Sequence, residues 1–139
     1  MKAVSKTIEV RTSGKSTYEI TDQIEEIVRE SAVETGTVTV FIKHTSASLV
    51  IFENADPSAR TDLEEYFERL VPEDADYFVH TQEGPDDMTS HLRSTLTSTS
   101  QVVPIAGGRM QLGTWQGIFV FEHRCAAHRR QIVVTVMGQ

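Results

Sequence analysis

The sequence has little cysteine, few aromatic residues and no long apolar run, and each shortage excludes a class of protein. Cys125 is the only cysteine among 139 residues, so no disulfide can form within the chain, and a reducing compartment is the simple expectation. No apolar run approaches the length that crosses a membrane, and the N-terminal segment lacks the apolar core of a signal peptide. We therefore expect a cytoplasmic protein with no membrane partner.

Positive charge is also scarce. The chain carries 13 lysines and arginines against 20 acidic residues, which gives a net charge of −7. Such a chain has no general electrostatic attraction for nucleic acid or for an anionic membrane, so neither is expected as a partner. An anionic ligand would need a local cationic pocket or a metal. The length and the 39% hydrophobic content predict one domain, residues 1–139, with a single core.

Residue alternation and β-branched content predict the N-terminal strands. Residues 4–10 alternate as a half-buried strand does, and residues 16–20 are expected to pair with them across a turn at 13–14. Residues 37–52 are rich in β-branched side chains and predict one long strand.

Helices are predicted by caps and apolar spacing. Asp22 and Glu25 form a potential capping box for a helix over 23–34 that Gly36 would end, and Asp56–Pro57 is typical of a second helix start. The second helix would bury a stripe formed by Leu63, Tyr66, Phe67 and Leu70. A short third helix would bury Met88, Leu92 and Leu96.

The C-terminal third is expected to be all β. A hairpin signature at 106–108 separates strands at 101–105 and 109–112, and further strands are expected at 118–123 and 130–137. Six to eight strands and two or three helices, segregated along the chain rather than alternating, predict an α+β fold.

One segment concentrates the side chains that bind divalent metals and transfer protons. Residues 80–91, HTQEGPDDMTSH, place two histidines and three carboxylates around a Gly84–Pro85 turn. Loops commonly carry binding residues, which favours a site, but a solvated acidic loop would have the same composition. The residues concerned are His80, Glu83, Asp86, Asp87 and His91.

A second candidate segment runs from His44 to Ser48. In a continuous strand, His44, Ser46 and Ser48 would extend an apolar face into a polar one, as when a strand leaves a core and enters a pocket. The alternative is a histidine satisfied by one backbone partner, with the serines at a bulge. A metal site built from His44, His80 and His91 is possible, although these residues lack a compact spacing such as HExxH.

The other candidates are spread along the chain. Glu53 is either a carboxylate that supports the histidines or a surface residue. Trp115, beside Gln116, either stacks on a ring-shaped ligand or packs in the core or in a subunit interface. Arg124 and Arg130 either bind phosphate oxygens in a bidentate manner or are solvated residues at strand ends.

Taken in order, these segments resemble the YjbQ family, also called secondary thiamine-phosphate synthase enzymes. The similarity covers nearly the whole chain without a large insertion, and the ordered combination is specific although each motif alone is weak. Family members usually carry proline at the position of Thr89, a departure from which we expect little functional change. The matching segments are HTSASL at 44–49, ENADP at 53–57, EGPDDM at 83–88 with His91, and 100–122, which contains VVPIAGGRMQLGTWQG.

The resemblance implies a single-domain α+β fold, largely an antiparallel β-sandwich with two or three helices, and a homotrimer with pockets near subunit boundaries. It also implies that His44, His80 and His91 are metal or anion ligands. The expected catalytic residues are Glu53, Glu83, Asp86 and Asp87. The expected ligands of substrate or phosphate are Ser46, Ser48, Trp115, Gln116, Arg124 and Arg130.

The activity that the resemblance implies joins a pyrimidine diphosphate to a thiazole phosphate and releases diphosphate, and it is regarded as secondary in the family. A divalent metal is expected because an acidic protein must hold two anions. Carboxylate ligands would favour magnesium and histidine ligands would favour zinc, and the sequence leaves both open. The alternatives are another metal-dependent phosphate-bond hydrolase, or a non-catalytic module that binds a small anionic metabolite.

Overall fold

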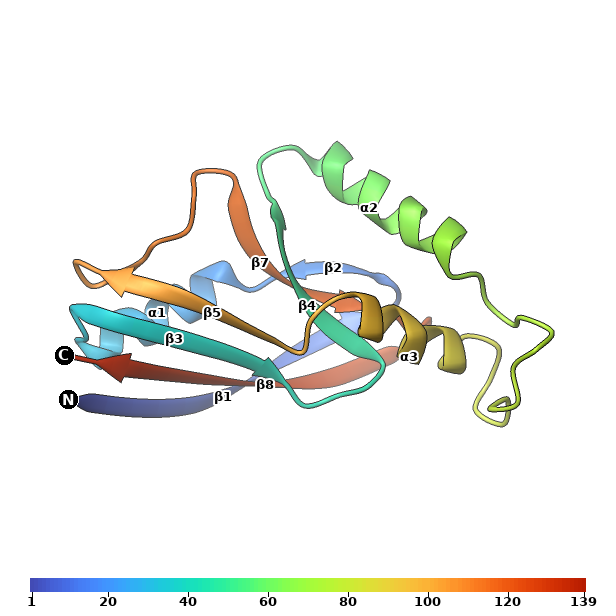
Figure 1. Cartoon of the computed structure of the whole chain (residues 1–139), viewed down its shortest axis with the longest axis horizontal. Coiled ribbons are helices and arrows are strands. Elements are labelled where there is room, and N and C mark those ends of the chain that lie inside the picture. Colours follow the sequence, from blue (N-terminus) through green and yellow to red (C-terminus); the bar gives the residue numbers. More distant parts are fainter.

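The computed structural model describes residues 1–139, and its strands form two antiparallel sheets (Figure 1). The five-stranded sheet has the order β1-β8-β3-β5-β6, and the three-stranded sheet has the order β2-β7-β4. The predicted α+β fold, largely an antiparallel β-sandwich with two or three helices, is confirmed. The elements are β1 (Lys2–Ser13), β2 (Ser16–Glu19), α1 (Thr21–Ser31), β3 (Thr35–Ile42), β4 (Ala47–Glu53), α2 (Pro57–Leu70), α3 (Asp87–Leu96), β5 (Ser100–Ala106), β6 (Arg109–Met110), β7 (Gln116–Glu122) and β8 (Ala127–Gly138).

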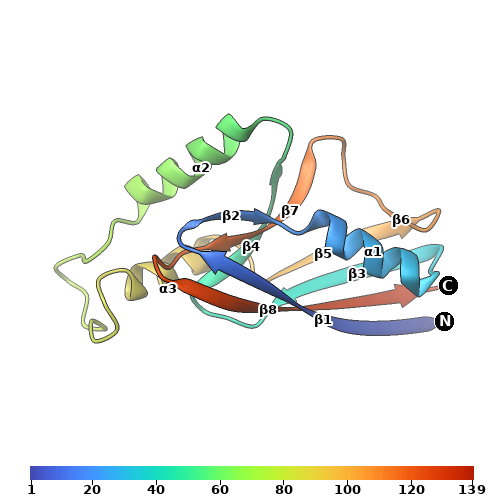
Figure 2. The same cartoon turned by 180° about the vertical axis from the view of Figure 1, so that it is seen from behind.

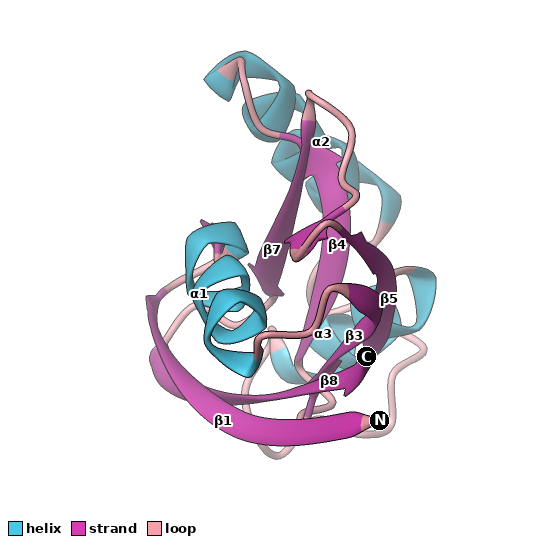
Figure 3. Cartoon of the chain, turned by 90° about the vertical axis from the view of Figure 1, so that its left-hand side faces the viewer, coloured by secondary structure: helices cyan, strands magenta, loops and turns pink.

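The core lies between the two sheets and α1. β3 pairs with β8 so that Val38 faces Val136 and Val40 faces Val134, and all four valines are fully buried. α1 lies inside the curl of the larger sheet and adds Ile24 to the same cluster (Figures 2 and 3). Burying one such side chain contributes about 1.5–3 kcal/mol, so this cluster of 18 residues is the main source of stability.

The expected hairpin between residues 4–10 and 16–20 is wrong. β1 pairs with β8 along all of its 12 residues, whereas β2 pairs with β7 in the other sheet. Gly14 has a φ of +123°, a conformation that side-chain-bearing residues rarely adopt, and it lets the chain turn from one sheet into the other. The connection is therefore a corner between sheets.

Residues 37–52 are not one strand either. β3 ends at Ile42 in the larger sheet, and β4 begins at Ala47 in the smaller one. His44 lies in the connection, so its side chain does not follow the alternation that a continuous strand would impose. β-branched content predicts extended backbone but not the sheet to which a strand belongs.

The first helix is shifted from its predicted position at 23–34 to Thr21–Ser31. No side-chain hydrogen bond caps its N-terminus, so the expected cap from Asp22 is wrong, and Ala32 ends the helix with a φ of 58°. Gly36 instead belongs to β3, where a Cβ atom would lie 2.0 Å from a carbonyl oxygen of β8. This glycine permits close strand approach rather than helix termination.

Helix α2 begins as predicted, with the Asp56 side chain accepting a hydrogen bond from the Ser58 N–H and with proline in the first turn. Its apolar stripe is mostly not buried. Phe67 is buried, but Tyr66 and Leu70 are 58% and 49% exposed. The helix contacts the smaller sheet through Phe67, whose ring centroid lies 5.1 Å from that of Phe121 in β7 (Figure 1).

Helix α3 reverses the expected pattern, because it buries polar side chains. Leu96, expected on the buried side, is 57% exposed. The guanidinium of Arg93 is buried and donates to Glu68 and to the Val71 carbonyl oxygen. The buried residues of this helix are Asp87, Thr89, Ser90, Arg93 and Ser94.

The C-terminal third follows the prediction. Gly107 and Gly108, both at positive φ, form the predicted turn between β5 and β6, and β7 and β8 occupy the two later predicted segments. No helix has the length and apolar content that a membrane crossing requires.

Candidate metal centre and ligand pocket

The loop before α3 and the first two turns of that helix bring three metal-binding side chains together. Nε2 of His80 lies 2.9 Å from Oδ2 of Asp87, and Nε2 of His91 lies 3.1 Å from the same oxygen. Asp87 and His91 are one helical turn apart, so they lie on the same side of α3. Each residue offers one ligand atom, and these atoms lie within 4.8 Å of one another.

A hydrogen bond at Nδ1 of His91 sets the orientation of the ring and therefore the direction in which Nε2 points. Nδ1 lies 2.8 Å from the carbonyl oxygen of Thr45. A carbonyl oxygen can only accept, so Nδ1 carries the proton, and Nε2 of a neutral ring has a free lone pair directed at Asp87. Two acceptors would then face each other. A cation between them, or a proton on Nε2, removes this conflict.

Asp87 is the centre of the cluster and is buried. Its Oδ1 accepts a 2.6 Å hydrogen bond from Arg124, while Oδ2 faces the two imidazoles. The Asp87 side chain is 2% exposed, but the His80 side chain is 54% exposed. Solvent therefore reaches the cluster from the histidine side.

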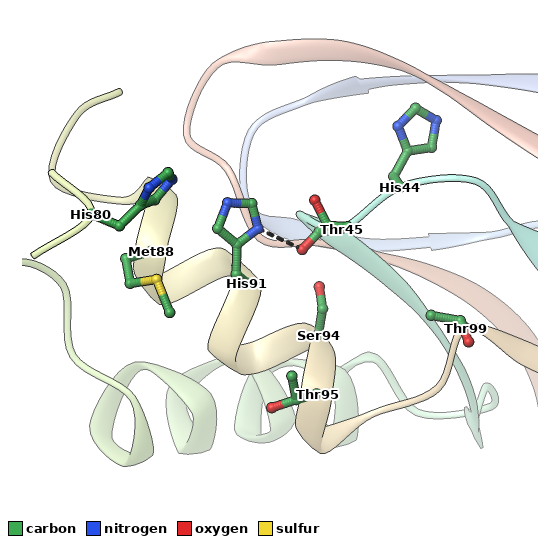
Figure 4. Close-up of a pocket in the computed structure, with 8 residues that line it drawn as sticks. All are labelled: His44, Thr45, His80, Met88, His91, Ser94, Thr95 and Thr99. Atoms are coloured by element: carbon green, nitrogen blue, oxygen red, sulfur yellow. Dashed lines mark hydrogen bonds between the residues drawn. The ribbon is translucent and has the colours of Figure 1, made fainter. Parts of the chain in front are cut away.

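The cluster opens into a pocket of about 560 Å³. Most residues of its wall are threonine, serine or histidine and none is lysine or arginine, but the surface that they expose to the pocket is mainly carbon. Ser94 is buried, and its Oγ has no hydrogen-bond partner within the chain. Figure 4 shows His80 and His91 on one side of the pocket and His44 on the other. The lining residues are His44, Thr45, His80, Met88, His91, Ser94, Thr95 and Thr99.

His44 lines this pocket but is outside the metal-ligand cluster. Its Nε2 accepts a 2.9 Å hydrogen bond from the backbone N–H of Gln131. His44 therefore has one backbone partner and also borders a pocket, although it does so from a connection between strands rather than from a continuous strand. The three expected histidines therefore do not form one cluster in this structure, and the buried carboxylate of Asp87 lies in the third position beside His80 and His91.

Comparison with known proteins places the chain in a family. The model of the family described as UPF0047 protein YjbQ-like matches residues 6–139. The chain belongs to the YjbQ family. A UPF0047 protein of Synechocystis sp. is 51% identical over 130 residues, which cover 94% of this chain and 88% of that protein. The YjbQ protein of Escherichia coli O157:H7 is 40% identical over 135 residues, 96% and 97% of the two chains.

Solved structures show the same fold. An uncharacterised YjbQ-family protein of Clostridium acetobutylicum superimposes with a TM-score of 0.87 at 29% identity, covering 95% of this chain and 99% of that one. A conserved hypothetical protein of Thermus thermophilus gives a TM-score of 0.85 at 30% identity with the same coverage. These similarities establish the family and the fold.

Within this YjbQ-family chain, Asp86 has a different role from Asp87. Burial alone would raise the pKa of the Asp86 carboxyl group, but the Cys125 N–H and the Arg124 guanidinium outweigh it and hold the pKa below its usual value. Asp86 therefore anchors the loop that carries Cys125. Glu83 contributes its carbonyl oxygen to Arg124, and its carboxylate lies outside the ligand cluster.

Both arginines that were expected to bind phosphate are already paired. Arg124 contacts Asp86 and Asp87. The Arg130 side chain is 3% exposed and is ion-paired with Glu122, which is fully buried. The expectation that these guanidinium groups reach a ligand is therefore not supported by their positions.

Three other expected site residues lie far from the pocket. Glu53 faces Gln116 at one end of the β4–β7 ladder, and Ala47 faces Glu122 at the pocket end. Seven residues of extended chain separate these ends by about 20 Å. The Glu53 carboxylate accepts from the N–H groups of residues 55 and 56, and the Gln116 side chain accepts from the N–H of residue 113. Trp115 is 62% exposed.

A buried histidine, His123, was missed from the sequence. Ser48, expected to bind ligand, is instead fully buried, and its hydroxyl lies 2.8 Å from Nε2 of His123 and accepts from Thr97. Burial, and then the charges of Arg93 and Arg130, lower the pKa of His123 to about 3. Nothing in the local sequence distinguishes a neutral core histidine from an exposed one. Ser46 lies beside an adjoining hollow.

Glu73, Asp86 and Cys125 form a second group with metal-ligand chemistry. Its members already have partners, because Lys15 pairs with Glu73, and Arg124 pairs with Asp86. Burial raises the pKa of the Cys125 thiol, which disfavours the thiolate form that binds metals. The group at His80, Asp87 and His91 is the stronger candidate.

Proposed function

We propose that this YjbQ-family protein is a metal-dependent enzyme that acts on a phosphorylated heterocyclic metabolite, and that His80, His91 and Asp87 hold the divalent ion. The observation that carries the proposal is the convergence of Nε2 of His80, Nε2 of His91 and Oδ2 of Asp87 on one point. A metal-binding histidine commonly donates its other N–H to a backbone carbonyl group, as His91 does to Thr45.

The donor set favours zinc or a similar borderline metal over magnesium. Two imidazoles and one carboxylate suit zinc, whereas magnesium prefers oxygen ligands. The carboxylates of Glu83 and Asp86, which would have supplied more oxygen, lie outside the cluster. Three protein ligands leave a position open for substrate, as in catalytic rather than structural zinc sites.

The pocket wall supports an anionic substrate only if a metal is bound. No lysine or arginine lines the pocket, so its hydroxyl groups alone would not neutralise a phosphate. A bound divalent ion would supply that positive charge and would stabilise a leaving diphosphate. This arrangement suits transfer between a pyrimidine diphosphate and a thiazole phosphate, and it equally suits hydrolysis of a phosphate bond.

The residues of the chain would position the ion and the substrate. Arg124 holds Oδ1 of Asp87 and keeps the carboxylate turned so that Oδ2 meets the imidazoles. Thr45 fixes the His91 ring through its carbonyl oxygen. The buried Ser94 hydroxyl, which has no partner, is available to a ligand oxygen if the side chain rotates.

Two measurements test the proposal. Zinc titrated into the metal-free protein by calorimetry should bind with one site per chain, and His91→Ala should abolish that site. His128→Ala is the matched control, because His128 lies outside the pocket. The zinc-loaded and magnesium-loaded proteins are then assayed for thiamine phosphate formation and for phosphate release. Zinc binding that is identical in wild type and His91→Ala would refute the metal site. Binding without turnover of either substrate class would leave a non-catalytic binding module.

A homotrimer is part of the proposal. The face of the larger sheet turned away from the core presents no charged residue on β3 or β5, and it exposes Phe41, Val102 and Met137 by 45%, 59% and 49%. Such an uncharged patch supports an interface with further copies of the chain. Light scattering should give three chain masses, and the mass of one chain would reject the trimer.

A further inference from the structure

His44 has contacts that differ from those of the two metal-binding histidines. The N–H of Gln131 points at its Nε2 from 2.9 Å. An amide N–H can only donate, so Nε2 must present a lone pair, and the proton of the neutral ring is on Nδ1. Nδ1 has no partner within the chain and is not sealed from solvent.

The surrounding segment holds this ring in place. The Lys43 N–H donates to the carbonyl oxygen of Gln131 at 3.1 Å, and Arg130 donates to the carbonyl oxygen of Ser46 at 3.3 Å. Residues on both sides of His44 are therefore tied to β8. Such a ring is positioned before any ligand arrives, which lowers the cost of binding.

The charges around His44 favour its neutral form. Burial lowers the pKa of His44 most, and the positive charge of Arg130 lowers it further. The carboxylate of Glu122 opposes this effect, but His128 and Lys43 add to the lowering. Geometry and charge therefore agree on a neutral ring.

His44 also lines two adjoining hollows. One is the pocket of about 560 Å³ that His80 and His91 line, and the other is a hollow of about 610 Å³. Thr45 and Thr99 line both. The second hollow contains Lys43, which is exposed and has no ion-pair partner, and it borders the proposed trimer interface at Phe41. One ligand could therefore occupy both hollows across His44.

We propose that His44 is a fixed, neutral hydrogen-bond donor, through Nδ1–H, to an oxygen of a phosphorylated ligand that crosses from the metal pocket to Lys43. The ligand class is a compound with two anionic groups, one near His80, His91 and Asp87 and one near Lys43. The metal-bound end rests on the proposed function, whereas the state of the His44 ring does not. His44 would thus select ligands rather than hold the metal.

The ring state is tested on the wild-type protein by nitrogen-15 NMR of the histidine side chains at neutral pH. The His44 resonances, assigned by their loss in His44→Asn, should show a protonated Nδ1 and an unprotonated Nε2. A ring protonated on Nε2, or on both nitrogens, would overturn the proposal whether or not the protein binds metal.

The ligand role is tested with two substitutions, each of which retains the hydrogen-bonding group of only one ring nitrogen. The amide of His44→Asn places an N–H near the position of Nδ1, and the amide oxygen of His44→Gln can reach the Gln131 N–H in place of Nε2. Zinc should bind both variants within twofold of wild type. Inorganic pyrophosphate, titrated into the zinc-loaded proteins, should bind His44→Gln about tenfold more weakly, because a hydrogen bond to a charged group is lost. His44→Asn should stay within threefold.

Other results would contradict the proposal. Zinc binding that weakens more than tenfold in both variants would make His44 a metal ligand. Pyrophosphate binding that is unchanged in His44→Gln would remove His44 from ligand recognition. Lys43→Gln should weaken pyrophosphate more than inorganic phosphate, and equal weakening would contradict a ligand that reaches Lys43. A wild-type protein that takes up no zinc would refute the proposed function, and the NMR result would still decide the ring state.

Discussion

Glu122 and Asp87 are both carboxylates with almost no solvent exposure, and each is paired with an arginine, yet their surroundings differ. Both oxygens of Glu122 are occupied inside the protein, by Arg130 and by the Thr12 hydroxyl. In Asp87, one oxygen accepts from Arg124, and the other faces two imidazoles that are open to a pocket.

This difference separates a structural ion pair from a candidate site. A sealed pair such as Glu122 and Arg130 joins strands and has no group left for a ligand. The Asp87 cluster keeps one oxygen and two ring nitrogens directed at a common point that solvent can reach. Buried charge alone therefore does not identify a site, whereas a buried carboxylate that meets metal-binding side chains beside a solvent-accessible pocket is a candidate.

The largest effect is expected on stability, when the cation of the buried Glu122–Arg130 ion pair is removed. Arg130→Ala would leave the fully buried Glu122 carboxylate without its cation, and it should lower the free energy of unfolding by about 3–5 kcal/mol. Arg129→Ala is the matched control, because Arg129 is exposed, and it should cost no more than about 0.5 kcal/mol. Urea unfolding measures both. A loss below about 1 kcal/mol in Arg130→Ala would show that the pair is not structural.

The next effect is expected on metal affinity. Asp87→Asn keeps the shape of the side chain but removes its charge, so zinc affinity should fall at least about 100-fold, or about 2.7 kcal/mol. Glu83→Gln, which alters an exposed carboxylate outside the cluster, should bind zinc within twofold of wild type. Calorimetric titration decides between these values. Equal zinc affinities in the two variants would contradict the assignment of Asp87, rather than Glu83, as a metal ligand.

A third effect is expected on the pH dependence of stability. Because the folded state lowers the pKa of His123 from 6.5 to about 3, the unfolded chain takes up the proton first as pH falls. The contribution of neutral His123 is therefore fully present above pH 6.5, and it is lost by about 1.4 kcal/mol per pH unit toward pH 3. His123→Gln keeps an acceptor for Ser48 and should remove this slope from urea unfolding curves. A slope identical to wild type would show that His123 is not held neutral.

The smallest effect is expected at the far end of β4, where a carboxylate has neither a buried cation nor a metal cluster. Glu53→Gln should retain an acceptor for the two N–H groups of the turn, and it should cost at most about 1 kcal/mol. Zinc affinity should be unchanged. Loss of zinc binding in this variant would show that the far end takes part in the metal site.

The sequence predicted most strands and the start of α2, because alternation and caps are local properties. It did not predict which strands share a sheet, since residues 37–52 have uniform β propensity but divide at residues 43–46 between two sheets. It also reversed the buried side of α3. The partners of Arg93 lie more than twenty residues away in sequence, so apolar spacing within the helix could not predict that its polar side is buried.

The sequence brought candidate residues together where they are close along the chain, although it grouped His44 with His80 and His91 as metal ligands and gave Asp87 a catalytic role. His80, Asp87 and His91 come from one segment, and their convergence follows from a turn and one helical repeat. The roles of Arg124 and Arg130 depended on carboxylates at other positions in the chain, and a charged residue gives no sequence signal of whether its partner is a ligand or the protein. Ser48 was misassigned because burial by α3 and β7 is a long-range property.

Anomalous X-ray diffraction from crystals of the zinc-loaded protein tests the central claim most directly. The peak at the zinc absorption edge should lie between Nε2 of His80, Nε2 of His91 and Oδ2 of Asp87, at ligand distances of about 2.0–2.2 Å. A peak at Glu73 and Cys125, a peak that includes His44 as a ligand, or no ordered zinc near Asp87 would contradict the account.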